Sequence, residues 1–256
     1  MSAATIKQTS RRILQHVLGE DRTRALAAWL EISLPGLGGK RTFAEFGEDV
    51  ILANIFQNRP VGFYVDVGAH HPIRESNTYL LYRWGWRGIN IDASPWSVHL
   101  LQRFRPRDIN IQALVSNQER SLTFHCFGLS SMNTVDPARA EAFKNKSGHA
   151  WTPLTLHSRS LRTILSDSVP AGTHIDLLSV DAEGHDLAVL ESNDWERFAP
   201  TVIIAEAHFP NLSHLLASPL HLFLHDRGYE LINMLGPSLI FIRSREKNHP
   251  HWPFIR

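Results

Sequence analysis

The chain has 256 residues, of which 43% are hydrophobic and 20% are charged, and its formal net charge at pH 7 is +1. This composition excludes an intrinsically disordered chain and is sufficient for one α/β domain with a full core. The near-zero net charge argues against nucleic acid as a partner, and the single cysteine, Cys126, excludes a disulfide framework and a cysteine zinc cluster.

Residues 1–40 predict a basic helical extension followed by a linker. Apolar residues recur there at near-helical spacing until the run SLPGLGGK introduces one proline and three glycines. Residues 1–41 contain seven Lys or Arg against three Asp or Glu. We expect the helix to pack on the rest of the chain or on a second subunit of a homodimer; the alternative is a peripheral contact with anionic lipid.

The sequence shows no sign of a membrane span. No apolar run reaches the roughly 18 residues that a span needs, and the N-terminus lacks the apolar core of a signal peptide. Together with the single cysteine, these features favour a cytoplasmic protein.

Residues 41–256 predict one domain in which helices and strands alternate. Its first half contains predicted helices at 46–57, 75–85 and 95–104 and predicted strands at 62–68, 87–94 and 109–116. A further strand at 121–128 is expected at a sheet edge or in a hairpin.

The segment 130–156 interrupts this pattern. It is polar, contains proline and glycine, and lacks sustained periodicity, so we expect an irregular insertion. We expect it to lie over the acceptor site, the place where the protein would bind its second substrate. Trp151 within it offers an aromatic face on which a sugar can stack. The alternative is a purely structural flap.

The second half returns to alternation. Helices are predicted at 160–167, 185–193 and 212–228 (broken at Pro219), and strands at 174–186, 200–210, 229–235 and 238–244, the first two of which run into polar turns. Strands that alternate with helices predict a doubly wound, mostly parallel, Rossmann-like sheet. The last two strands, joined by a Gly-Pro turn, predict an antiparallel terminal hairpin.

The turn DVGAHHP, after the first strand, indicates the kind of ligand. Gly68 permits a tight turn, but a pyrophosphate site would have further glycines and no carboxylate at the strand end. Asp66 stands there and suits an ammonium group. Asp92, 24 residues beyond Gly68 at the end of the next strand, suits the two hydroxyls of a ribose.

An ammonium-binding acid and a ribose-binding acid together describe S-adenosylmethionine. We expect the neighbouring residues of the same turns to contact this cofactor as well: Ala69, His70, Ala93, Ser94, Ser116 and Asp181. Two alternatives remain, an NAD(P)-dependent oxidoreductase and a non-catalytic scaffold of the same fold. The missing glycines and the presence of Asp66 argue against the first, and the acids at four strand ends argue against the second.

The chain resembles the FkbM-type S-adenosylmethionine-dependent methyltransferases over roughly residues 46–231. The matching stretches are FGEDVILANIF, YVDVGAHHPIRESNTYLLYRWGWRGINIDASP, LLSVDAEGHDLAVLESNDWERFAPTVIIAEA and GYELI. The resemblance implies a seven-stranded sheet and methylation of a hydroxyl, commonly on a sugar of a glycolipid, polysaccharide or natural product. It also implies that Asp66, Gly68 and Asp92 contact the cofactor and that Asn77 and Thr78 face its methionine end.

Methyl transfer to a sugar hydroxyl needs a base, because the hydroxyl is a poor nucleophile at pH 7. The fourth and fifth strand ends supply the candidate catalytic residues Asp181, Glu183, His185, Glu206 and His208. We expect His185 to be the base and Asp181 to orient it, the methyl donor or the acceptor hydroxyl. The alternative is that His185 caps the helix it begins and that the next residue, an aspartate, is solvated.

A metal is the rival mechanism. Asp181 and Glu206 are expected on neighbouring strand ends, where two carboxylates and water molecules would suit Mg²⁺. The ion would then lower the pKa of the acceptor hydroxyl.

Overall fold

The computed structural model describes residues 42–57, 59–128 and 130–244. The predicted N-terminal helical extension lies outside the described residues. Within them, no helix has both the length and the apolar character that crossing a membrane requires.

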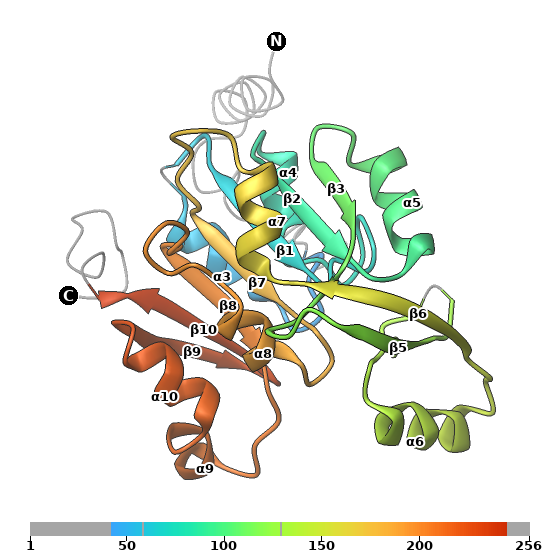
Figure 1. The fold of residues 1–256 in the computed structure, drawn as a ribbon. Helices are drawn as coiled ribbons and strands as arrows, with labels where there is room; N and C mark the ends of the chain where they lie inside the picture. Colours follow the sequence, from blue (N-terminus) through green and yellow to red (C-terminus); the bar gives the residue numbers. More distant parts are fainter. Residues whose placement is uncertain (1–41, 58, 129, 245–256) are drawn as a thin grey trace, which may run out of the picture. The chain divides into compact units, whose positions relative to one another are not determined.

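A seven-stranded sheet forms the centre of the described part, in the order β3-β2-β1-β7-β8-β10-β9 (Figure 1). It is parallel from β3 to β8, as predicted. The parallel strands are β1 (Phe63–Val67), β2 (Arg87–Asp92), β3 (Ile109–Gln112), β7 (Leu177–Val180) and β8 (Val202–Glu206).

The two C-terminal strands form the predicted antiparallel pair. β9 (Tyr229–Leu235) and β10 (Ser238–Arg243) are joined at Gly236 and Pro237, and β10 also pairs antiparallel with β8. β9 is therefore the edge strand, while β10 is internal and nearly all buried.

Helices cover both faces of the sheet, which explains the near-continuous apolar runs of its parallel strands. One face packs against apolar residues of α7 (Leu161–Ser168), α8 (Asp186–Glu191), α9 (Leu212–Leu216) and α10 (Pro219–His225). The other packs against α3 (Glu48–Ile55) and α4 (Tyr79–Arg83), with Trp86 fully buried. The doubly wound arrangement places the carboxyl ends of β1, β2, β7 and β8 at one edge of the sheet.

Helix starts follow their sequence signals. α5 (Pro95–Phe104) and α10 each begin with proline, whose fixed φ suits the first helical position. The side chains of Ser160 and Ser218 cap α7 and α10 by accepting backbone N–H groups.

The third predicted strand splits after Gln112. β3 continues the main sheet, and β4 (Leu114–Val115) turns away to pair with β6 (Thr152–Arg159) in a second sheet of order β4-β6-β5. The predicted extra strand is β5 (Ser121–Cys126), which pairs antiparallel with β6 as one arm of a hairpin.

The segment 130–156 is irregular only in part, in contrast to our prediction. It contains α6 (Pro137–Ser147), which Asp136 caps by accepting from the backbone N–H of Ala138 and which ends at Gly148 with φ 75°, and it then enters β6. The helix escaped prediction because only Ala140 is buried, so no apolar stripe marks it.

Trp151 is held by contacts within the small sheet and α6. Its ring packs against those of His125 and Phe127, with centroids 5.4 and 5.9 Å apart, and the Lys144 ammonium lies 4.9 Å from its centroid. The ring therefore consolidates the small sheet and α6, and it is not among the residues that line the cavity described next.

Candidate functional site

A cavity lies at the carboxyl ends of β1, β2, β7 and β8, where α/β sheets commonly bind ligands. It holds about 990 Å³ of empty space, counting the part open to solvent. Its lining contains no Lys or Arg among the described residues. Seven carboxylates line it: Glu45, Glu48, Glu75, Asp92, Asp181, Glu183 and Glu206.

The turn after β1 holds two chain segments in close contact. Gly68 has φ 80°, and a Cβ there would lie 1.8 Å from the carbonyl oxygen of Asp181. No other residue fits without a backbone shift. The turn after β1 and the turn after β7 are thus packed directly against each other where they line the cavity.

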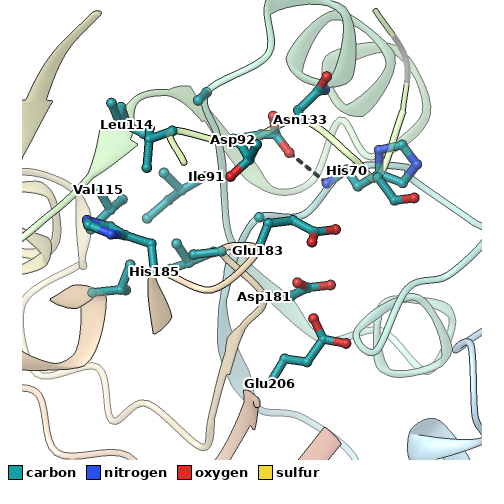
Figure 2. A pocket seen from close by; sticks show the side chains of 18 of the residues that line it. His70, Ile91, Asp92, Leu114, Val115, Asn133, Asp181, Glu183, His185 and Glu206 are labelled. Atoms are coloured by element: carbon teal, nitrogen blue, oxygen red, sulfur yellow. Dashed lines mark hydrogen bonds between the residues drawn. The ribbon is translucent and has the colours of Figure 1, made fainter. Parts of the chain in front are cut away.

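His70 occupies the position where a dinucleotide fingerprint would have a glycine. Its φ is 43°, a left-handed conformation that few non-glycine residues adopt. Its backbone N–H donates to a carboxylate oxygen of Asp92 at 2.8 Å (Figure 2). The amide that would face a phosphate is therefore already bonded to an acid of the protein.

Asp92, at the end of β2, is buried and lines the cavity. Its second carboxylate oxygen accepts from the backbone N–H of Ser94 at 2.7 Å. Burial raises the pKa of Asp92 to about 6, although these two backbone hydrogen bonds oppose the shift. Each oxygen keeps a free lone pair, so the carboxylate still accepts from a neighbouring diol.

Asp66 lies just behind the lining. It is buried, accepts from the Thr78 hydroxyl at 2.6 Å, and does not itself line the cavity. Burial raises its pKa, opposed by the Thr78 hydrogen bond and by the charge of Arg105. Asn77, next to Thr78, does line the cavity, and its amide donates to Ser179 at 3.1 Å.

The carboxylates of Asp181, Glu183 and Glu206, at the ends of β7 and β8, point to the same side (Figure 2). Asp181 is surrounded by protein yet open to the cavity, and it shares a hydrogen bond with Glu206. Burial and the charge of Glu206 raise the pKa of Asp181 well above its usual value, and burial raises that of Glu206. The two acids are best described as sharing one proton.

Glu183 forms the link to the small sheet and its helix. It has φ 50°, and its carboxylate pairs with Arg139 of α6. Burial and the charge of Asp181 raise its pKa to about 7, with Arg139 opposing the shift.

The aspartate after His185 is not solvated, in contrast to the alternative drawn from the sequence. Asp186 is buried and accepts from the backbone N–H groups of Ala182 (3.3 Å) and Glu206 (3.0 Å). Burial raises its pKa to about 7. Asp186 thus fixes the ends of β7 and β8 to each other and sets the positions of Asp181 and Glu206.

His185 lines the cavity but does not cap α8 with its side chain. Its Nε2 lies 3.0 Å from the Ser116 hydroxyl, and its ring points toward Val115, away from Asp181 (Figure 2). Burial and then the charge of Arg120 lower its pKa, so the ring is neutral near pH 7. Ser116, not Asp181, is the residue that orients it.

The remaining sequence candidates differ in their positions. Ala93 lines the cavity, whereas Ala69, Ser94 and Thr78 are buried in the turns that shape it. His208 is exposed beyond β8 and is not a lining residue.

Sequence reasoning missed several lining residues from outside the strand ends. Glu45 precedes α3, Glu48 is its first residue, Glu75 lies in the loop after β1, and Asn133 and Thr134 lie in the segment before α6. Glu48 could have been found from the sequence, because an acid within an apolar helical pattern needs a hydrogen-bond partner when it is buried. Its carboxylate accepts from the Ser238 hydroxyl at 2.7 Å. The others carried no local signal.

The geometry gives little support for a metal centre. Among the described residues, no group of three or more His, Cys, Asp or Glu side chains is placed to hold a metal ion. Asp181 and Glu206 do lie together on neighbouring strand ends, but only as a pair.

Comparison with known proteins agrees with this architecture. The family model described as the methyltransferase FkbM domain matches residues 66–231, from the acid at the end of β1 into β9. A comparison with curated proteins gave no match. The matched region includes nearly all of the cavity and well over half of the chain, so the chain belongs to the FkbM methyltransferase family.

Proposed function

We propose that this protein transfers the methyl group of S-adenosylmethionine to a hydroxyl on a sugar of a glycolipid, polysaccharide or glycosylated natural product. The observation that carries the cofactor is the His70–Asp92 hydrogen bond at 2.8 Å. This bond occupies the His70 N–H that a pyrophosphate would need and places the buried Asp92 carboxylate where the phosphate would bind.

The residues of the cavity fit an adenosyl cofactor without phosphates. Asp92 would accept from the ribose hydroxyls, with Ala93 and Ser94 beside it, and Asn77 would face the methionine end near Asp66. The acidic lining without Lys or Arg favours a ligand that bears sulfonium and ammonium charges. These features favour the methyl donor over the NAD(P) alternative.

When bound, the cofactor supplies an electrophilic methyl group on sulfur. Transfer of that methyl group to a hydroxyl oxygen would release the hydroxyl proton, which a residue of this chain would have to accept. His185 suits this role because its ring is neutral near pH 7 and lines the cavity. The pair Asp181 and Glu206, from which the His185 ring points away, suits orientation of the methyl donor, since one proton shared by two acids leaves both a donor and acceptors.

The segment 130–156 supports an acceptor site at the cavity's mouth. Asn133 and Thr134 line the cavity, and Arg139 joins α6 to Glu183, which lines the cavity with Asp181 and Glu206. We assign Glu183 to holding this segment closed over the acceptor. His208 receives no role, because it is exposed outside the lining.

Calorimetry with S-adenosylhomocysteine and with NAD tests the cofactor. We expect binding of the first and none of the second; the reverse result overturns the proposal. Transfer of a labelled methyl group to a panel of cell-surface glycans and glycosylated natural products then tests the acceptor. Activity confined to amines or carboxylic acids would contradict O-methylation.

A further inference from the structure

A buried arginine outside the cavity is connected to the loop that shapes it. Arg105 ends α5, is fully buried, and its Nε lies 2.9 Å from the carboxylate of Asp108. Its Nη2 donates to the Tyr64 hydroxyl at 2.6 Å, and the same hydroxyl donates to Asp108 at 2.6 Å. Its planar fork is thus fixed on one side by the core.

On the other side, the guanidinium reaches three points of the loop between β1 and α4. Nη2 donates to the Thr78 hydroxyl at 2.9 Å, and Nη1 lies 3.4 Å from both the Pro72 carbonyl oxygen and the Ser76 hydroxyl. The guanidinium also stacks over Tyr82, 4.8 Å from its centroid. The Arg105 guanidinium therefore contacts both ends of the segment 72–78 and one residue between them.

This loop carries the lining residues Glu75 and Asn77. Glu75 has φ 53°, a conformation that the surroundings must impose on a non-glycine residue. Thr78, held by Arg105, donates in turn to Asp66 at 2.6 Å. The chain of contacts therefore runs from the core through Arg105 and Thr78 to the acid at the end of β1.

Burying an ion pair gives little net stability, because the desolvation of both charges offsets their attraction. A buried guanidinium that donates five hydrogen bonds instead fixes the relative positions of its acceptors. The single ammonium group of a lysine cannot reproduce this arrangement. We propose that Arg105 is a positioning residue that presets residues 72–78 for the amino-acid end of the methyl donor. This inference rests on the proposed function for its ligand, and it assigns to Arg105 an effect on cofactor affinity rather than on chemistry.

The test compares Arg105→Lys with Arg107→Lys. Arg107 stacks over the same Tyr82 ring, 4.1 Å from its centroid, and contacts the Tyr82 carbonyl rather than the loop. At a temperature where each variant is folded, we expect Arg105→Lys to weaken S-adenosylhomocysteine binding about tenfold or more. Turnover at saturating S-adenosylmethionine should stay within about twofold, and Arg107→Lys should leave both quantities within about twofold.

A double-mutant cycle with Thr78→Val separates positioning from general stability. If Arg105 acts through Thr78, Arg105→Lys should cost far less affinity in the Thr78→Val background than in the wild type. Tyr64→Phe removes only the hydroxyl that anchors the guanidinium and should weaken binding about threefold; this variant decides the matter if Arg105→Lys does not fold. A folded Arg105→Lys or Tyr64→Phe protein with wild-type affinity, or one with reduced turnover and unchanged affinity, overturns the proposal.

Hydrogen exchange of the ligand-free protein distinguishes this inference from the proposed function. A wild-type protein that binds no S-adenosylhomocysteine contradicts the proposed function. In that case Arg105→Lys should still speed amide exchange in residues 73–79 more than Arg107→Lys does. Equal exchange in the two variants would contradict the positioning role itself.

Discussion

At the scale of single residues, His70 makes the turn after β1 a poor site for a phosphate. His70 adopts a left-handed conformation, and its backbone N–H donates to Asp92. The same carboxylate also accepts from Ser94, so one acid satisfies the amides of two turns. A phosphate would have to compete with a buried negative charge for the same donors.

Asp92 should therefore control cofactor affinity. We expect Asp92→Ala to weaken S-adenosylhomocysteine binding by roughly 1.5–3 kcal/mol, the scale of hydrogen bonds to a charged acceptor. Because the pKa of Asp92 is raised to about 6, its acceptor charge is present at pH 7 and lost by pH 5. Calorimetry should show affinity falling as pH falls through 6, with a smaller slope in Asp92→Asn. Wild-type affinity in Asp92→Ala would remove this residue from the site.

His185 should affect turnover and not cofactor binding. A base acts only in the transition state, so we expect His185→Ala to lower kcat by roughly 10²–10⁴-fold with cofactor affinity nearly unchanged. Because the pKa of His185 is lowered by burial, the acid limb of the kcat profile should lie below pH 6.5. His99→Ala is the matched control, since His99 is an exposed histidine on α5. Near wild-type turnover in His185→Ala would show that His185 is not the base and that its hydrogen bond with Ser116 is purely structural.

The paired acids Asp181 and Glu206 should act without a metal. They share a hydrogen bond whose proton a divalent cation would have to displace, and the described residues form no group of three or more metal-binding side chains. We expect full activity in excess chelator, measured by labelled methyl transfer. Loss of activity that added Mg²⁺ restores, with Asp181→Ala and Glu206→Ala worse than His185→Ala, would instead establish metal activation.

At the scale of elements, the sequence predicted those whose two faces are both buried. The strands β1, β2, β7 and β8 read as apolar runs closed by acids, and each of these acids lies at or just behind the cavity. The breakpoint after Gln112 was not predictable, because the continuous run INIQALVS leaves the main sheet only through its pairing with β6. α6 was missed for the opposite reason: an exposed helix has no apolar periodicity, and only its Asp-Pro start and Gly end mark it.

The same limit applied to the cavity. Residues at strand ends were foreseeable, since parallel strands bring their carboxyl ends to one edge. Glu45, Asn133 and Arg105 were not, because long-range packing brings each of them to the site or to the loop that shapes it. Asp181 was expected to orient His185, the methyl donor or the acceptor hydroxyl, whereas the partner of His185 in the structure is Ser116, from the chain after β4.

α6 should respond to the acceptor through Arg139. Its ion pair with Glu183 is a link between this helix and the chain after β7. We expect slowed hydrogen exchange in residues 130–156 when acceptor is present, and a raised KM for the acceptor in Arg139→Ala. Lys146→Ala, in the exposed last turn of α6, is the matched control. Equal protection with and without acceptor would make the segment a structural flap.

At the scale of the whole molecule, one edge of the sheet concentrates negative charge that the fold does not neutralise. The net charge of the chain is only +1, yet the cavity lining holds seven carboxylates and no Lys or Arg. Glu183 is compensated by Arg139, and Glu48 and Asp92 each accept two hydrogen bonds. Asp181 and Glu206 share one proton, so the pair keeps one negative charge. The charge that remains on the lining forms an electrostatic field that a cationic cofactor would relieve.

This field should make the ligand-free protein less stable at pH 7.5 than at pH 5. Burial raises the pKa of Asp92 to about 6 and those of Glu183 and Asp186 to about 7, so the native state binds more protons than the unfolded chain between about pH 4 and 7. The free energy of unfolding therefore falls as pH rises through that window. The lowered pKa values of His70, His71 and His185 act in the opposite direction below pH 6.5, but these histidines are only partly buried.

Asp186 allows a direct test of that sign. Its raised pKa makes burial of its charge at pH 7.5 cost on the order of a few kcal/mol, at about 1.4 kcal/mol for each pH unit. We expect the Tm to fall by several degrees from pH 5 to pH 7.5. Asp186→Asn should flatten this dependence because asparagine resembles the protonated acid, whereas Asp167→Asn, at an exposed position on α7, should not. S-adenosylmethionine, as a cation, should raise the Tm more at pH 7.5 than at pH 5. An unchanged pH dependence in Asp186→Asn would show that the buried acids are compensated in a way that their contacts do not reveal.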